Sequence, residues 1–272
     1  MICSRCAAQG ATDAAGLCPA CAVGGGAPVP APSGGVLRSP VGLSYVVVAL
    51  LAVVIAVDLA AVYAALNTHA VVGRILEGGT GEYADDGRRA DLLMYRVASL
   101  YVTALVATGV VFIVWFRRVR GNAQVFAPDL QRRGPGWAVG AWFIPIANLW
   151  IPRQIAGDIW RASELERRAS RGVLNAWWTL WVVSLAVDRI ATRAWDRAEY
   201  GDDLRRAALG LVAGYVIDIA AAVLAILFVR RLTALQHAKA LAGGGSRPQE
   251  PEPEKEKEHE QESESERVDG TP

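Results

Sequence analysis

Four long apolar runs constrain the fold of this chain more than any other feature. They occupy residues 41–66, 93–116, 174–191 and 207–229. As helices rising about 1.5 Å per residue, runs of this length match a hydrocarbon layer roughly 30 Å thick. Hydrophobic residues make up 53% of the chain and its mean hydropathy is +0.25, as in a polytopic membrane protein. The sequence therefore predicts an all-α membrane protein with four transmembrane helices.

A fifth apolar stretch, at residues 137–151, is ambiguous. It reads Trp-Ala-Val-Gly-Ala-Trp-Phe-Ile-Pro-Ile-Ala-Asn-Leu-Trp-Ile and is followed by Pro152. As a helix it would reach only about 22 Å, and Pro145 would interrupt its backbone hydrogen bonds. Two interpretations are open: a re-entrant or interfacial segment in a four-span protein, or a fifth span.

The arginines beside this stretch favour the re-entrant interpretation. Residues 117–133 and 153–171 each contain five arginines. Because basic segments stay on the cytoplasmic side, a crossing would place one of them outside. We therefore expect a plasma-membrane protein with both termini cytoplasmic, and residues 67–92 and 189–206 as polar outer loops. Apolar residues at helical spacing predict an amphipathic helix at 153–171, lying on the membrane surface.

All four cysteines lie near the N-terminus, in two Cys-x-x-Cys pairs at residues 1–23. Cys3, Cys6, Cys18 and Cys21 have the spacing of a structural Zn²⁺ site. A disulfide pair and a redox-active thiol pair are the alternatives, and a cytoplasmic location favours zinc. Arg5 is the only basic residue within the two Cys-x-x-Cys pairs. We therefore expect this zinc ribbon to contact protein partners rather than nucleic acid.

Two further segments flank the membrane domain, which we place at residues 41–241. Residues 24–40 form a Gly/Pro-rich linker, predicted to keep the ribbon mobile. Residues 242–272 begin with glycines and continue into an acidic tail of alternating Glu, Lys and Ser. Such a composition cannot bury a core, so we expect the tail to be disordered.

Three motifs resemble a bacterial membrane family. They are Trp115-Phe-Arg-Arg-Val-Arg-Gly-Asn122, the stretch from Gly136 to Pro152, and Asp158-Ile-Trp-Arg-Ala-Ser163. The resemblance, over roughly residues 45–235, is to the domain of unknown function family numbered 4328. It implies a polytopic plasma-membrane protein and brings no assigned activity, cofactor or catalytic residue.

Two aspartates inside the predicted spans are the sharpest candidates for function. Asp58 lies in the first span and Asp218 near the centre of the last. Because a carboxylate in a membrane is costly, it faces the bundle interior or water. Two interpretations of these aspartates are open. They form a proton or cation site, with Asp188 and Arg189 nearer the outer surface, or each is a protonated side chain hydrogen-bonded to a neighbouring helix.

Other polar residues have both a functional and a structural interpretation. Pro145 and Asn148 either present an open carbonyl and an amide to a ligand or form a packed elbow. The basic cluster at the end of the second span either holds lipid phosphate or caps the helix and anchors it; its residues are Arg117, Arg118, Arg120 and Asn122. The nine tryptophans predict interfacial anchoring. Gly210 and Gly214 form a G-x-x-x-G pattern that permits close helix contact.

No catalytic motif stands out, which favours a non-enzymatic protein without excluding an enzyme. There is no Walker A loop, G-x-S-x-G elbow or H-E-x-x-H motif. The first hypothesis is a membrane scaffold or sensor whose zinc ribbon or acidic tail contacts a cytoplasmic protein. The alternatives are a small transporter or channel using Asp58 and Asp218, and a lipid-binding or lipid-modifying protein. Besides the lipid bilayer, we expect a second copy of the chain as a partner.

Overall fold

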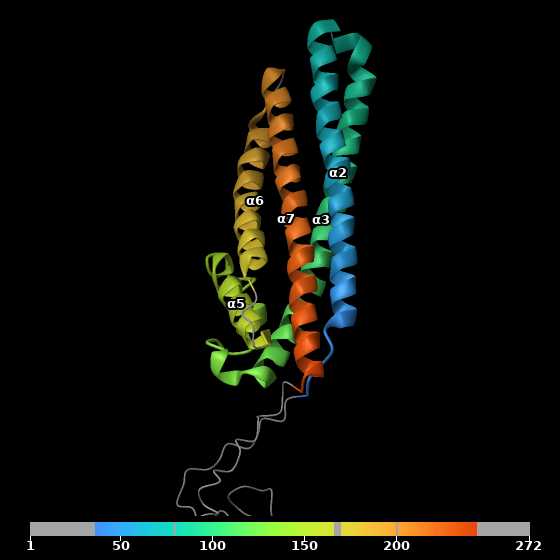
Figure 1. Ribbon diagram of the computed structural model, residues 1–272. Coiled ribbons are helices and arrows are strands. Elements are labelled where there is room, and N and C mark those ends of the chain that lie inside the picture. Colours follow the sequence, from blue (N-terminus) through green and yellow to red (C-terminus); the bar gives the residue numbers. More distant parts are fainter. Residues whose placement is uncertain (1–35, 79, 166–169, 200, 244–272) are drawn as a thin grey trace, which may run out of the picture.

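The computed structural model describes residues 36–78, 80–165, 170–199 and 201–243, and this part of the chain is helical (Figure 1). The predicted zinc ribbon and most of the acidic tail lie outside these residues. The long helices are α2 (Val41–Gly78), α3 (Thr80–Phe126), α6 (Gly172–Arg197) and α7 (Asp202–Leu241). The short elements are η1 (Pro128–Leu130), α4 (Trp137–Gly140), η2 (Ala147–Leu149) and α5 (Ile151–Ser163).

The four long helices form an open row. Helix α2 packs extensively on α3 and α7, and α7 packs on α2 and α6. Helices α3 and α6 are the two edges of the row and make no extensive contact with each other. The beginning of α2 and the end of α7 lie at the same end of the bundle, where α5 packs (Figure 1).

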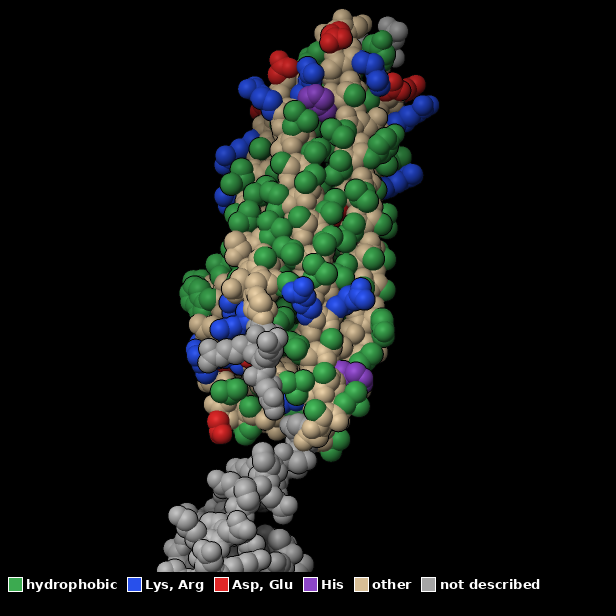
Figure 2. Space-filling model, in the orientation of Figure 1, with side chains coloured by type: hydrophobic (Ala, Val, Ile, Leu, Met, Phe, Trp, Pro, Cys, Tyr) green, Lys and Arg blue, Asp and Glu red, His purple; other side chains and the backbone are tan. Residues whose placement is uncertain are grey.

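Three helices are long and apolar enough to cross a membrane by length and composition. They contain the predicted spans 41–66, 93–116 and 207–229, and they run at Val41–Gly78, Tyr83–Phe126 and Asp202–Leu241. The predicted third span, 174–191, lies within α6. That helix has 26 residues and a length of about 39 Å, but it is not among the three. On the face in Figure 2, apolar side chains cover the middle of the bundle. Charged side chains gather at the end of the bundle opposite α5 and in a band near the α5 end.

The predicted polar loops are mostly helical, which corrects the sequence interpretation. Helix α2 continues through residue 78 and α3 begins at residue 80, so the glycine run does interrupt the helix. The flanking polar residues nevertheless stay helical because Val71 and Ala90 are buried between helices and Arg74 pairs with Asp86 at 3.4 Å. Likewise, only residues 198–201 separate α6 from α7.

Residues 137–150 are irregular rather than one helix. After α4 the backbone runs through turns to η2, and α5 begins at Ile151. A fifth span would need a helix of about 20 residues, and the α-helix in this segment, α4, has four. Six large apolar side chains of this segment are exposed: Trp137, Phe143, Ile144, Ile146, Leu149 and Trp150.

The predicted amphipathic helix at 153–171 is shorter than expected and is covered by protein on both faces; its location at the membrane surface stays a prediction. Helix α5 ends at Ser163, and Glu164 follows in extended backbone. Both faces are covered, since Ile155 and Ile159 are buried and so are Asp158 and Trp160. The helix therefore packs into the bundle, where Gln236 on α7 donates to Ser163 Oγ and Asp158 pairs with Arg161 of α5 itself.

Candidate functional site

Three carboxyl groups from three helices come together inside the bundle. Tyr101 Oη on α3 donates a hydrogen bond to Asp218 Oδ2 on α7 at 3.2 Å. The Asp188 side chain on α6 lines the same cavity as Asp218. Asp58 on α2 is fully buried nearby, and neither of its carboxyl oxygens has a hydrogen-bond partner. The sequence singled out Asp58 and Asp218, and the structure adds Asp188 as their direct neighbour.

A cavity of about 460 Å³ extends from this cluster along the interior of the bundle. Asp188, Asp218 and Tyr101 line it, whereas Asp58 lies behind its wall. The other lining side chains are mostly apolar and come from all four long helices and the 137–150 segment; they include Leu51, Leu105, Phe112, Trp142, Trp177, Trp181 and Ala222. The site therefore combines carboxyl groups with a long apolar chamber.

Most tryptophans belong to an interior aromatic cluster, which corrects the prediction of interfacial anchoring. Trp115, Trp160, Trp177 and Trp178 are buried. Trp177 stacks on Phe228 with ring centroids 4.6 Å apart, and Trp142 packs against rings of both α3 and α6. Trp142 thus bridges the two edge helices at the α5 end of the cavity. Trp137 and Trp150 remain exposed, as interfacial anchoring predicts.

A polar network closes the α5 end of the bundle. Asn122 on α3 accepts a hydrogen bond from the Arg38 backbone N–H at 3.0 Å and donates one to the Arg38 carbonyl at 2.8 Å. It also donates to Gln236 Oε1 on α7 at 3.0 Å. Gln236 in turn donates to the Val119 carbonyl and to Ser163 Oγ on α5. We call Arg38, Asn122, Ser163 and Gln236 the junction; it joins the segment before α2 to three helices.

The motifs behind the family resemblance meet around this junction. Asp158 on α5 is buried, pairs with Arg161 and lies 3.8 Å from Arg132 Nε. Arg120 is buried and donates to Gln124 Oε1 and to the Arg133 carbonyl. The motif residues thus fasten the segment after α3 to α5. At the start of α5, burial and then the nearby charge of Arg171 lower the pKa of Arg153.

The lipid-phosphate candidates separate into two groups. Arg120 and Asn122 are buried with protein partners, so they do not face lipid headgroups. Arg117 is exposed, and the partly exposed Arg118 donates to the Ser39 carbonyl at 3.2 Å. The structure therefore favours the anchoring interpretation, and only Arg117 and Arg118 remain lipid-phosphate candidates. Residues 36–40, the end of the predicted mobile linker, are held by these contacts.

Pro145 and Asn148 lie apart from the carboxyl cluster. Neither lines the cavity. Pro145 is exposed, and Asn148 donates its backbone N–H to the Ile144 carbonyl at 2.8 Å. The Asn148 Oδ1 atom is buried without a partner. The predicted polar site is thus split, with the aspartates in the bundle and these two residues in the irregular segment.

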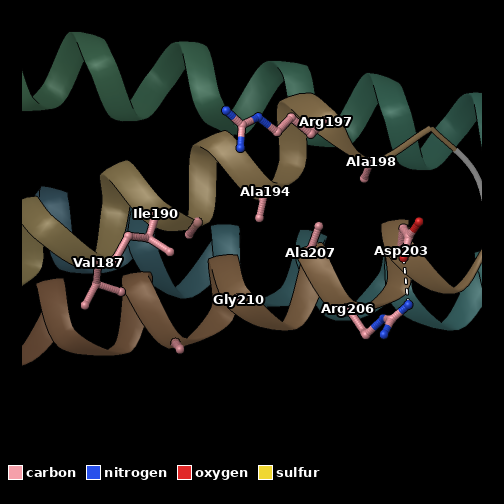
Figure 3. Close-up of a pocket in the computed structure, with 11 residues that line it drawn as sticks. Val187, Ile190, Ala194, Arg197, Ala198, Asp203, Arg206, Ala207 and Gly210 are labelled. Atoms are coloured by element: carbon pink, nitrogen blue, oxygen red, sulfur yellow. Dashed lines mark hydrogen bonds and ion pairs between the residues drawn. The ribbon is translucent and has the colours of Figure 1, made fainter.

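A second hollow lies between α6 and α7 at the end away from α5 (Figure 3). Its volume is about 530 Å³, and its walls are mostly small apolar side chains with Arg197 at the edge. Arg206 pairs with Asp203 at 2.7 Å. Gly210 faces this space, and a Cβ on it would have no neighbour within 4 Å. Only Gly214 of the G-x-x-x-G pair makes a close helix contact, against Asp188 and Val187.

The described residues contain no group of His, Cys, Asp or Glu side chains with the arrangement of a metal site. The predicted ligands Cys3, Cys6, Cys18 and Cys21 lie outside those residues, so zinc binding stays a prediction. Inside the bundle, the three aspartates come from α2, α6 and α7 with a tyrosine from α3.

Comparison with known protein families identifies the family of this chain. Residues 80–234 match the family described as a domain of unknown function (DUF4328). The chain belongs to this family. The match starts at α3, later than residue 45, so α2 with Asp58 lies outside the DUF4328 region. No curated protein and no solved structure matches the chain.

Sequence reasoning missed two parts of the site. It named Asp188 together with Arg189 as part of the aspartate site, whereas Asp188 lines the cavity and Arg189 is exposed. The aromatic cluster was also missed, although Trp177, Trp178 and Trp181 lie within two turns of one helix. Their spacing was a usable signal, but the partners Phe112 and Phe228 come from distant parts of the chain.

Proposed function

We propose that this DUF4328 protein is a non-enzymatic membrane scaffold or sensor. It crosses the plasma membrane four times, through α2, α3, α6 and α7, and has both termini in the cytoplasm. Its cytoplasmic segments, at residues 1–35 and 244–272, contact a protein partner. Cys3, Cys6, Cys18 and Cys21 bind one structural Zn²⁺.

The junction is the observation that carries this proposal. Both appended segments connect to the bundle at one end, one through Arg38 and the other through the end of α7. Asn122 contacts Arg38 and Gln236 at once, so a change in the spacing of α3 and α7 alters how the N-terminal segment is held. A bundle of this kind couples the membrane interior to its cytoplasmic segments.

Two features support the proposed topology. The exposed apolar side chains of residues 143–150 suit insertion into the bilayer from the α5 end. The arginines of residues 117–133 and 153–171 lie on both sides of that segment, at the end where the positive-inside rule places the cytoplasm. With α6 as a span, residues 189–206 lie outside, where four acidic residues accompany five arginines.

Partner analysis by photo-crosslinking in cells tests the scaffold or sensor role. The full chain is compared with a chain lacking residues 1–35, a chain lacking residues 248–272, and the four-cysteine variant Cys→Ser. We expect at least one covalent partner to be lost in a truncated chain, while Asp218→Asn retains it. An identical partner set in both truncated chains would contradict the proposal.

Transport of a proton or cation is the second candidate. The observation in its favour is the fully buried Asp58 carboxyl without a hydrogen-bond partner, close to Asp188 and Asp218. Reconstituted vesicles with an internal pH dye and an imposed cation gradient test it. A flux lost in Asp218→Asn, which keeps the hydrogen-bonding shape, would favour transport over the sensor role.

A further inference from the structure

We propose that the cavity between α3 and α6 binds a lipophilic cation. The positive group lies against the carboxyls of Asp188 and Asp218, and the apolar body lies along the aromatic wall. This site does not depend on what the cytoplasmic segments contact, and it serves either role proposed above.

The cavity has one polar and one apolar end. Along α6, Trp177 and Asp188 both line it, and eleven residues of helix separate them by about 16 Å. The same order holds on α3, where Tyr101 lies at the carboxyl end and Phe112 at the aromatic end. An amphiphile with a compact head and an apolar body therefore has one orientation in the cavity.

The charge at the polar end is not balanced by protein cations. None of the ion pairs in the described structure involves Asp58, Asp188 or Asp218. Arg189, next to Asp188 in sequence, is exposed. Asp188 and Asp218 both line this end of the cavity, and a carboxylate in such apolar surroundings requires a counterion. The Asp58 carboxyl, which is fully buried and has no hydrogen-bond partner, does not line the cavity.

Size and access fit a molecule that partitions into the bilayer. A volume of about 460 Å³ lies within the range of small-molecule sites, about 300–1,000 Å³. Because α3 and α6 lack extensive contact, a ligand dissolved in the membrane enters between them. The tryptophan and phenylalanine rings of the wall also favour a cationic group with aromatic or alkyl substituents.

Equilibrium binding to the full chain in nanodiscs tests the proposal, with tetraphenylphosphonium as the probe. Tetraphenylborate, which has nearly the same shape and the opposite charge, is the control ligand, and empty nanodiscs give the partition background. We expect saturable tetraphenylphosphonium binding near one per chain, and no competition by tetraphenylborate. Binding that only follows the empty-disc background, or equal site binding of the anion, would overturn the proposal.

Two pairs of variants locate the site. The double substitution Asp188→Asn and Asp218→Asn should weaken binding at least about tenfold, while Asp196→Asn, exposed on the same helix, should not. Gly109 lines the cavity and has open space around its Cβ position, so Gly109→Leu should obstruct the ligand by a similar factor. Gly121→Leu, also with open space and on α3, is its control.

Melting curves separate binding from folding. If the double variant unfolds, Gly109→Leu and the single variant Asp188→Asn carry the test. Unchanged affinity in a folded Gly109→Leu protein would overturn the assignment to this cavity, and unchanged affinity in a folded Asp188→Asn protein would overturn the role of the carboxyls.

Discussion

Tyr101 Oη on α3 lies 3.2 Å from Asp218 Oδ2 on α7 and donates a hydrogen bond to it inside the bundle. This bond joins an edge helix to a central helix, as the bonds of Gln236 to Asn122 and Val119 do at the α5 end. It also fixes one oxygen of Asp218, so that the carboxyl presents its remaining lone pairs to Asp188 and the cavity.

Removing this hydroxyl should loosen the bundle slightly. We expect Tyr101→Phe to lower the free energy of unfolding by about 0.5–1.5 kcal/mol, the usual net contribution of one hydrogen bond. Tyr95→Phe is the matched control, because Tyr95 lies on the same helix and is 72% exposed. Thermal or denaturant unfolding in detergent measures both. Equal stability of the two variants would show that the bond contributes nothing.

The two glycines of α7 should respond differently to alanine. A Cβ on Gly214 would stand 2.9 Å from Asp188 Oδ1, whereas a Cβ on Gly210 would have no neighbour within 4 Å. We expect Gly210→Ala to be neutral or stabilising by up to about 1 kcal/mol through helix propensity. Gly214→Ala should be about 1–3 kcal/mol less stable than that control because the Asp188 carboxyl must move. Unfolding measured in one detergent compares the pair.

Truncating Gln236 should destabilise the α5 end of the bundle. This side chain is 1% exposed, and its loss leaves the Val119 carbonyl, at 2.8 Å, without its side-chain donor. We expect Gln236→Ala to cost about 2–4 kcal/mol from several buried partners. The exposed neighbour His237→Ala should cost less than about 0.5 kcal/mol. Hydrogen exchange of residues 36–45 should also rise only in the Gln236 variant.

The re-entrant topology predicts one side for the segment after α5. In a chain whose native cysteines are replaced by serine, Ser170→Cys should react with an impermeant thiol reagent only after the cells are opened. Ser170 is exposed, whereas Ser163 is fully buried and would be silent in either topology. A cysteine in place of the exposed Arg88, in the predicted outer loop 67–92, should react in intact cells. Labelling of Ser170→Cys from outside would contradict the prediction that the segments before and after residues 137–151 are both cytoplasmic.

The cysteine pairs predict bound metal. Metal analysis of the purified full chain should give about one equivalent of zinc, lost when Cys3, Cys6, Cys18 and Cys21 are all replaced by serine. Less than about half an equivalent in protein prepared without chelator would count against the ribbon. Disulfide mapping under the same conditions tests the alternative, because a disulfide pair would leave no free thiols.

The sequence alone determined the helical class, the apolar segments and the interruption at Pro145, because these depend on local composition and periodicity. It also identified Asp58 and Asp218, since a carboxyl in an apolar run is costly wherever it lies. It misjudged residues 67–92 and 189–206, where turn-forming residues were outweighed by packing between neighbouring helices. It also did not predict that α5 is covered on both faces, where Asp158 pairs with Arg161 and Ser163 accepts a hydrogen bond from the buried Gln236.

Only the tertiary structure decided which residues share a site. Asp188, Asp218 and Tyr101 are brought together by the pairing of α3, α6 and α7, and the same pairing joins Asn122 to Gln236 across 114 residues of chain. Hydropathy reports how readily each segment leaves water, but it contains no information on which face of one helix meets which face of another. That choice follows from the packing of small residues such as Gly214 and rings such as Trp142, so the cavity and the junction emerge only once the helices are assembled.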